Sequence, residues 1–159
     1  MNDFKRIVII RIKGKAGLKR SVKDTFQMLR LYKKNNAVVV SNTPAYAGMI
    51  AKIQDAVTWG EIDEETCKLL LQKRGKLPGK KPLTEQYLQQ HCKITMDQLC
   101  KEFMAGKKEW KDVPGLKPFF KLNPPQHGFE SKGIKVPFSL GGVLGYRKEK
   151  INALLQRMM

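Results

Sequence analysis

The sequence has few acidic residues and few histidines, and each shortage argues against a class of site. Only 14 of its 159 residues are Asp or Glu, against 31 Lys and Arg, which gives a formal net charge of +17. The two histidines, His91 and His127, lie far apart in the sequence, and nothing in the sequence supplies the base partner that a nucleophilic cysteine would need. The acids at 63–65 begin an expected helix, where carboxylates favour the helix dipole. We expect no catalytic residues and no enzyme activity.

Cysteine usage favours buried thiols over cross-links or metal ligands. The three cysteines, Cys67, Cys92 and Cys100, are odd in number, contain no C-x-x-C pair and follow no secretory signal. These features disfavour a disulfide framework and a zinc site, although His91, Cys92 and Cys100 could be imagined as ligands. We expect a reducing cytoplasmic environment, no metal and no cofactor.

Long hydrophobic runs and nucleotide-binding loops are also missing. The longest early apolar run, Ile7–Ile10, is followed by Arg11 and is too short for a signal core or a membrane span. The segment 141–145 is rich in glycine, but no Gly-Lys-Ser/Thr ends it and no convincing strand precedes it. We expect neither a membrane anchor nor a small-molecule substrate.

Positive charge on a folded core is what the chain does have. Apolar residues make up 42% of the sequence, which is enough for a folded domain rather than a disordered basic tail. Residues 1–60 carry 12 basic and 3 acidic side chains and residues 101–159 carry 12 and 5, whereas residues 61–100 carry 7 and 6. This charge favours a polyanionic partner, first nucleic acid and second an anionic membrane surface, contacted through both ends of the chain.

Hydrophobic periodicity predicts alternating strands and helices. Strands are expected at 4–12, 36–41, 56–62 and 119–122, and helices at 18–32, 44–55, 63–73, 84–91, 95–105 and 147–158. For the second helix, Asn42 or Thr43 is the N-cap and Pro44 takes the first position. The pattern alone is compatible both with a parallel α/β sheet and with a split βαβ arrangement around an antiparallel sheet.

The first basic end of the chain is a candidate RNA contact. Cations fill the loop after the first strand and line one face of the next helix, whose N-terminal N–H groups favour phosphate. Glycines shape the loop and allow close approach of its backbone. The predicted contacts are Arg11, Lys13, Gly14, Lys15, Gly17, Lys19, Arg20, Lys23 and Arg30.

The second candidate is the segment 123–146, a long loop with no expected secondary structure of its own. Its cations favour phosphate, and Phe129, Phe138 and Tyr146 either stack on unpaired bases or pack into the core. The predicted contacts at this end are Lys121, His127, Lys132, Lys135, Gly141, Gly142 and Arg147. Because the glycine pair has no expected core role, Gly142→Val should weaken RNA binding more than folding.

Four motifs in order resemble those of a known family. They are Asn42-Thr43-Pro44-Ala45-Tyr46-Ala47-Gly48-Met49-Ile50 with Lys52, Thr58-Trp59-Gly60-Glu61-Ile62, Leu116-Lys117-Pro118 leading to Leu122 and Pro124-Pro125, and Gly141-Gly142 through Leu144-Gly145-Tyr146-Arg147 to Glu149-Lys150-Ile151-Asn152. From Ile7 to Met158 the sequence resembles the archaeal form of large-subunit ribosomal protein thirty, a relative of eukaryotic large-subunit protein seven.

The resemblance implies an α+β fold, with a ferredoxin-like βαβαβ core and an antiparallel sheet in residues 1–62. Residues 63–159 would then form a helical extension with an RNA-binding loop and a C-terminal helix. It also implies contact with large-subunit ribosomal RNA and neighbouring ribosomal proteins, a structural role in translation, and no catalysis. The family usually follows its double proline with Arg-Gly-Gly, where this sequence has Gln126-His127-Gly128. His127 would take part of the arginine's role if it is protonated beside RNA.

Two other functions are compatible with a basic surface. A protein that binds duplex DNA would need a recognition helix with base-reading side chains, and no expected helix is an obvious candidate. An RNA-processing enzyme would show turnover that His127→Ala or Cys100→Ala abolishes. The leading hypothesis is an RNA-binding protein whose phosphate contacts set the affinity and whose specificity comes from RNA shape.

Overall fold

The computed structural model describes residues 5–159, so Phe4, which the pattern places at the start of the first strand, lies outside the described residues. The elements are β1 (Arg6–Arg11), α1 (Arg20–Met28), β2 (Asn36–Ser41), α2 (Pro44–Ile53), β3 (Val57–Glu61), α3 (Glu64–Arg74), α4 (Glu85–Cys92), α5 (Met96–Met104), β4 (Phe120–Lys121), β5 (Gly145–Tyr146) and α6 (Ile151–Met158). Short 3₁₀ turns lie at Pro78–Lys80, Trp110–Asp112, Phe138–Leu140 and Lys148–Lys150. The expected α+β class with a ferredoxin-like core is confirmed.

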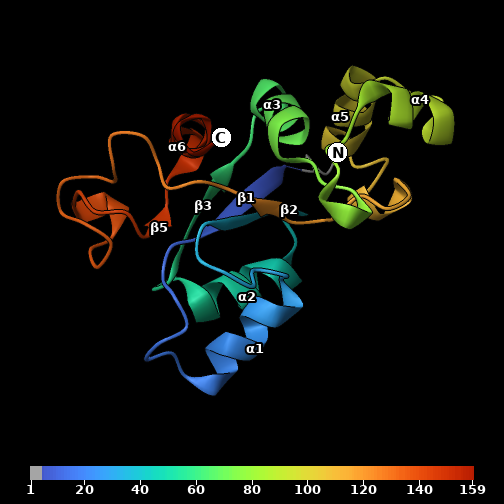
Figure 1. Ribbon diagram of the computed structural model, residues 1–159. Helices are drawn as coiled ribbons and strands as arrows, with labels where there is room; N and C mark the ends of the chain where they lie inside the picture. Colours follow the sequence, from blue (N-terminus) through green and yellow to red (C-terminus); the bar gives the residue numbers. More distant parts are fainter. Residues whose placement is uncertain (1–4) are drawn as a thin grey trace.

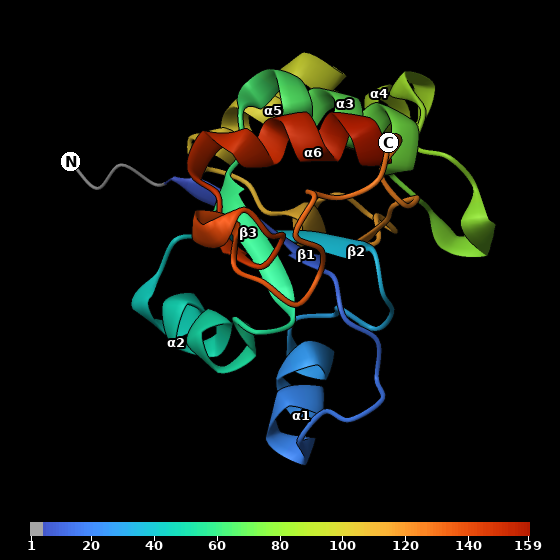
Figure 2. The same ribbon diagram turned by 90° about the vertical axis from the view of Figure 1, so that its left-hand side faces the viewer.

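The sheet has the strand order β4-β2-β1-β3-β5, and β1 pairs antiparallel with both β2 and β3. This antiparallel pairing matches the split βαβ arrangement and excludes the parallel α/β sheet that the sequence pattern also allowed. Figures 1 and 2 show α1 and α2 on one side of the sheet and α3, α5 and α6 on the other. The molecule is therefore built in three layers, with β1 at the centre of the middle one.

The burial of β1 on both faces explains its almost continuous apolar sequence. Side chains alternate along a strand, so Ile7 and Ile9 pack against α1 and α2. Val8 and Ile10 point the other way and join the core that includes α3, α5 and α6. A strand buried on both faces needs apolar residues at consecutive positions rather than at every second one.

The two helices of the first layer show how local signals set their ends. Thr43 caps α2 by accepting a hydrogen bond from the Tyr46 N–H, and Pro44 takes the first helical position, as predicted. The helix α1 is shorter than the predicted 18–32. It ends at Met28 because Arg30 adopts a left-handed φ of 60° and the Leu31 N–H turns back to the Phe26 carbonyl.

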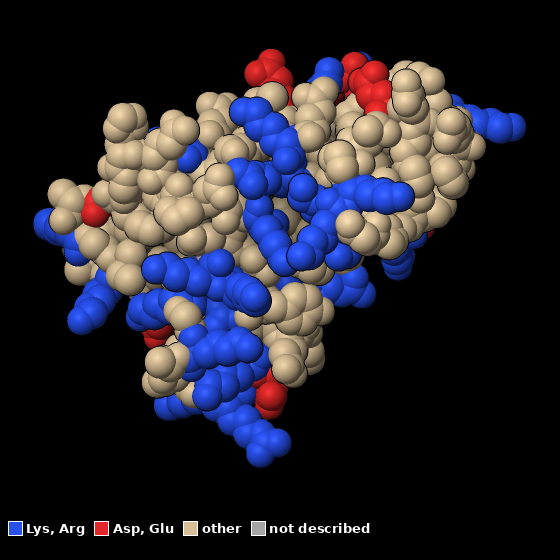
Figure 3. All heavy atoms as spheres, viewed as in Figure 1, with Lys and Arg blue, Asp and Glu red and all other residues tan. Residues whose placement is uncertain are grey.

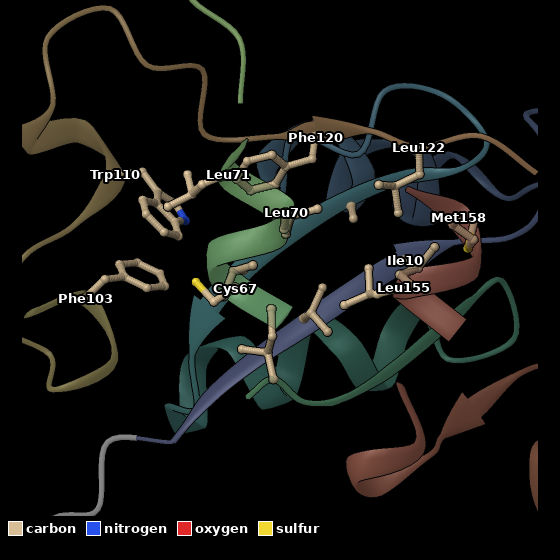
Figure 4. Packing of buried hydrophobic residues seen from close by; sticks show 14 of the residues in the cluster. Ile10, Cys67, Leu70, Leu71, Phe103, Trp110, Phe120, Leu122, Leu155 and Met158 are labelled. Atoms are coloured by element: carbon tan, nitrogen blue, oxygen red, sulfur yellow. The ribbon is translucent and has the colours of Figure 1, made fainter. Parts of the chain in front are cut away.

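The C-terminal half of the chain covers the second face of the sheet. Figure 4 shows side chains of α3, α5 and α6 gathered over β1, among them Leu70, Phe103 and Leu155. All three are fully buried, and burying a side chain of this size contributes roughly 1.5–3 kcal/mol. The strands of residues 1–62 and the helices of residues 63–159 thus share one hydrophobic core.

The predicted loop 123–146 has more structure than its sequence indicates. It contains the Phe138–Leu140 turn, and β5 begins at Gly145 and pairs parallel with β3. The prediction of a loop without secondary structure is therefore wrong, because a strand of two residues leaves no detectable periodicity. The last helix is confirmed, although a 3₁₀ turn replaces its expected first residues.

Family motifs near β3 serve this packing. A Cβ on Gly60 would lie 2.1 Å from the Lys148 carbonyl oxygen, so only glycine lets the turn before α6 approach the strand. Buried Asn152 then donates to the Glu61 carbonyl (3.2 Å) and accepts from the Asp63 N–H (3.1 Å). These residues join α6 to the junction of β3 and α3. No helix in residues 5–159 is both long and apolar enough to cross a membrane.

Candidate nucleic-acid interface

The antiparallel pairing of β1 and β2 gathers basic segments at one end of the sheet. The Asn35 N–H donates to the Arg11 carbonyl (2.8 Å), and the Leu122 N–H donates to the Asn35 carbonyl (3.1 Å). The end of β1, the start of β2 and the end of β4 are therefore neighbours. Lysines lie beside all three strand ends, because Lys13 follows β1, Lys33 and Lys34 precede β2, and Lys121 ends β4. The end of β4 is far in sequence from the other two.

We call the cations at this end of the sheet and on the neighbouring loop and helix the basic surface. Its members are Lys13, Lys15, Lys19, Arg20, Lys23, Lys33, Lys34 and Lys121. Lys13 is half-buried and the other seven side chains are exposed. Figure 3 shows Lys and Arg forming a band from α1 upward across the middle of this face, while Asp and Glu lie mainly near its rim.

No member of the basic surface forms an ion pair with an acid among residues 5–159. The ion pairs of this part of the chain involve other cations, such as Lys68 and Lys108. The start of α1 adds to the positive potential, since its N-cap Lys19 makes no side-chain cap and its first turn has no acid. Open N–H groups at such a terminus favour an anion.

The loop before α1 has the expected shape. Gly14 and Gly17 are exposed, and Gly17 has a φ of 72° that favours glycine. Arg30 is exposed too, but the structure does not bring it into the same hollow as Lys15 and Lys23. It lines a separate hollow along β2, together with residues that include Tyr46.

Arg11 differs from the other cations predicted at this end, because the residue is only 2% exposed. Its Nε donates to the Lys13 carbonyl (2.8 Å), its Nη1 donates to the Leu31 carbonyl (2.7 Å), and its guanidinium lies 4.0 Å from the centre of the Phe26 ring. Burial lowers the pKa of this guanidinium. Arg11 therefore does not lie on the open surface, where its sequence position suggested.

Arg147 differs in the same way, because it is 3% exposed and bonded within the chain. It pairs with Glu130 through both terminal nitrogens, Nη1 and Nη2, and its Nε donates to Thr58 Oγ1 (2.8 Å). It also donates to the Val143 carbonyl (3.0 Å) and stacks over Phe138 at 4.6 Å. Its charge is compensated within the protein by Glu130, in contrast to the open cation that its sequence position suggested.

Gly142 is buried too, and a Cβ at this position would lie 2.0 Å from the Val136 carbonyl oxygen. The expectation that Gly142→Val would weaken RNA binding more than folding assumed a glycine with no core role, and this buried position contradicts that premise. Its neighbour Gly141 is exposed, with a φ of 90°, and lies against the side chain of Lys132.

The remaining residues predicted in the second end are accessible. His127, Lys132 and Lys135 are exposed. The segment around His127 is held against the end of α6, because the Gln126 N–H donates to the Arg157 carbonyl (3.0 Å) and Arg157 Nη1 donates to the Gly128 carbonyl (3.0 Å). These contacts bring Arg157 to the same region.

The aromatic side chains of this segment pack mainly against the protein. Phe129 contacts the core, and half-buried Phe138 lies under Arg147. Tyr146 is 46% exposed, but its ring stacks on Trp59 and its hydroxyl donates to Glu61. This hydrogen bond, together with burial, raises the pKa of Tyr146 to about 12. None of the three rings is held as a free stacking platform.

Sequence reasoning missed three cations. Lys33 and Lys34 lie in the turn before β2, and Arg157 lies in the last turn of α6. The adjacent lysines are a local signal, but their neighbours in space depend on the pairing of β2 with β4. That pairing is not visible in the four-residue segment 119–122.

The cysteines and histidines form no site. No group of three or more His, Cys, Asp or Glu residues in the range 5–159 is placed to hold a metal ion. Cys67 and Cys100 are buried and Cys92 is half-buried, all as free thiols. A hydrogen bond with Cys100, together with burial, raises the pKa of Cys67. His91 stacks on Tyr87, far along the chain from His127.

Comparison with known proteins finds similarity along nearly the whole chain. The family described as Ribosomal protein L30p/L7e matches residues 7–57. Large ribosomal subunit protein uL30 of Methanopyrus kandleri is 43% identical over 149 residues, which cover 93% of this chain and 100% of the relative. The uL30 protein of Methanococcus vannielii is 45% identical, covering 95% and 97%, and that of Nanoarchaeum equitans is 42% identical, covering 94% and 96%.

Proposed function

Because the chain belongs to the ribosomal protein L30p/L7e family, we propose that it binds and stabilises folded ribosomal RNA in the large ribosomal subunit. A protein of this family is a component of that cytoplasmic particle and a structural protein rather than an enzyme. The basic surface is the observation that supports RNA binding. Its cations lie together without acidic partners among residues 5–159, and such a cluster favours a polyanionic partner.

The mechanism is charge neutralisation by a surface of fixed shape. The sheet holds Lys13, Lys33, Lys34 and Lys121 at one end, and the loop and α1 add further cations and open N–H groups. Contacts to phosphate orient a protein on nucleic acid and set much of its affinity. Specificity then comes from the shape of the folded RNA, because the deep groove of A-form RNA hides its base edges.

A second contact region lies in the segment 123–146. His127, Lys132 and Lys135 are exposed there, and Gly141 allows close approach of the backbone. Arg157 contacts the segment 126–128, in which the family usually has an arginine and this sequence does not. Arg157 supplies the charge that position 126 lacks.

The chain divides at residue 62 in this proposal. Residues 1–62 carry most of the basic surface, and residues 63–159 cover the second face of the sheet and supply the second contact region. The nearly neutral helices around residues 64–100 face away from the first contact and are available to neighbouring ribosomal proteins.

The salt dependence of binding to a large-subunit ribosomal RNA fragment tests the proposal. If six or more phosphates are contacted, affinity should fall by roughly a thousandfold between about 50 and 200 mM salt. Lys33→Gln, Lys34→Gln and Lys121→Gln together should reduce the slope of log K against log salt by roughly 2–3.

A matched triple variant serves as the control. Lys80→Gln, Lys101→Gln and Lys107→Gln remove the same charge from exposed positions in the helical extension and should leave the slope nearly unchanged. A nearly flat salt profile for the unmodified protein would overturn the proposal. Equal affinity for random duplex DNA would favour the DNA-binding alternative instead.

A further inference from the structure

A small hollow lies where the end of β1 meets α1. Its volume is about 140 Å³, and it is lined by Arg11, Lys15, Lys23, Phe26, Gln27, Leu31 and Tyr32. The lining comes from the strand end, the basic loop, α1 and the turn after α1. Three of its side chains are cations and none is an acid.

Arg11 is held at this hollow by bonds within the chain. Two backbone carbonyls accept hydrogen bonds from its Nε and Nη1, and the ring of Phe26 lies against its guanidinium plane. Its Nη2 has no hydrogen-bond partner among residues 5–159, although 98% of the side chain is shielded from solvent. Arg11 thus lines the hollow with a fixed, nearly buried guanidinium, and its Nη2 is not among the polar atoms that the fold seals from solvent.

The charge around Arg11 is not balanced by the protein. Lys15 and Lys23 are exposed and take part in no ion pair within the described residues. Asp24, the acidic residue that follows Lys23 in the sequence, does not line the hollow. A buried cation without a counter-charge is costly, and two further cations beside it increase that cost. An anion in the hollow would offset it.

We propose that this hollow binds a single phosphoryl group, supplied by the RNA backbone or by free phosphate. Arg11 Nη2 donates from the wall, and Lys15 and Lys23 close over the anion as mobile cations. Gln27 and Tyr32 provide further donors, since an amide and a phenol both bond phosphate oxygens. Guanidinium groups suit phosphate because their donors are planar and fixed. The RNA source rests on the proposed function, whereas the phosphoryl chemistry does not.

Titration of the RNA-free protein with inorganic phosphate and with pyrophosphate tests the chemistry. Calorimetry or ³¹P line broadening should report saturable binding of one equivalent. Lys15→Gln with Lys23→Gln should weaken it by about tenfold or more, because two charge-assisted contacts are lost. Lys33→Gln with Lys34→Gln removes the same charge outside the hollow and should change it by less than about threefold. Equal losses of affinity in the two double variants would overturn the inference. It would also be overturned if neither anion binds saturably and no RNA phosphate proves essential in the experiment described next.

Phosphate-ethylation interference on a large-subunit ribosomal RNA fragment tests the source. An RNA backbone source predicts one phosphate whose ethylation blocks the unmodified protein but not the Lys15/Lys23 double variant. Saturable anion binding without such a phosphate would identify free phosphate as the ligand. If both tests fail but RNA binding remains steeply salt-dependent, the hollow does not bind a phosphoryl group and the proposed function is unaffected.

Discussion

Replacement of Arg147 by Ala separates a role in folding from a role in RNA contact. The side chain is 2% exposed and bonds Glu130, Thr58 and the Val143 carbonyl. Breaking a buried ion pair by removing one partner costs about 3–5 kcal/mol, because the other charge loses its compensation. Glu130 keeps 23% of its side chain exposed and regains some hydration, so the lower end, about 3 kcal/mol, is expected.

That loss is large for a chain of this size. Natural domains are stable by about 5–15 kcal/mol, and each kcal/mol shifts the melting temperature of a domain with about 150 residues by roughly 2–4 °C. Arg147→Ala should therefore lower the Tm by about 6–12 °C and move the urea midpoint in the same direction. Arg157→Ala is the matched control, because Arg157 is 36% exposed and 4.0 Å from the same carboxylate. It should cost less than about 1 kcal/mol.

The pH dependence gives the same prediction a second readout. Burial alone would raise the pKa of Glu130, but its hydrogen bonds to Arg147 and to its own backbone, with the charges of Arg147 and Arg157, lower it overall. The stabilisation by this carboxylate is present above its unfolded pKa of about 4.3 and is lost as the pH falls through the lower folded pKa. Arg147→Ala should flatten that acid limb. A change in unfolding free energy below about 1 kcal/mol, combined with a strong loss of RNA affinity, would refute the structural role.

Three further predictions concern other parts of the chain. Gly142→Ala should lower the free energy of unfolding by more than about 2 kcal/mol, because the new Cβ would collide with backbone atoms. The control is Gly48→Ala within α2, where a Cβ meets nothing within 4 Å. In the same urea titration this variant should be neutral or slightly stabilising. The Tyr146 phenol should ionise near a pH of about 12, seen as the absorbance difference from Tyr146→Phe, and Glu61→Gln should move it toward about 10; an unchanged titration would contradict the hydrogen bond. Of the three thiols, only half-buried Cys92 should react quickly with a thiol reagent in the native protein, and rapid reaction of all three would show that the α3–α5 core opens readily.

Some elements of the first 62 residues could be predicted because their signals are local. Thr43 and Pro44 mark the start of α2, and the apolar run from Ile7 marks β1. The faces of β1 could not be separated, since a strand buried on both sides has no period-two pattern. Local pattern also could not place β5, whose two residues pair with a strand more than eighty positions earlier.

The candidate site was only partly predictable for a related reason. Sequence shows where cations are, but the packing decides which of them stay exposed. Arg11 and Arg147 look like their exposed neighbours in the sequence, yet each lies over a phenylalanine ring and bonds groups that the fold brings together. Lys33 and Lys34 join the basic surface through the pairing of β2 with β4, which requires the complete sheet.

Sedimentation of a cell lysate through a sucrose gradient, before and after a high-salt wash, tests the central claim most directly. The account predicts that the chain migrates with large ribosomal subunits at one copy per particle and stays bound at moderate salt. Migration at the top of the gradient, free of ribosomes, would contradict it, and the basic surface would then need another polyanion.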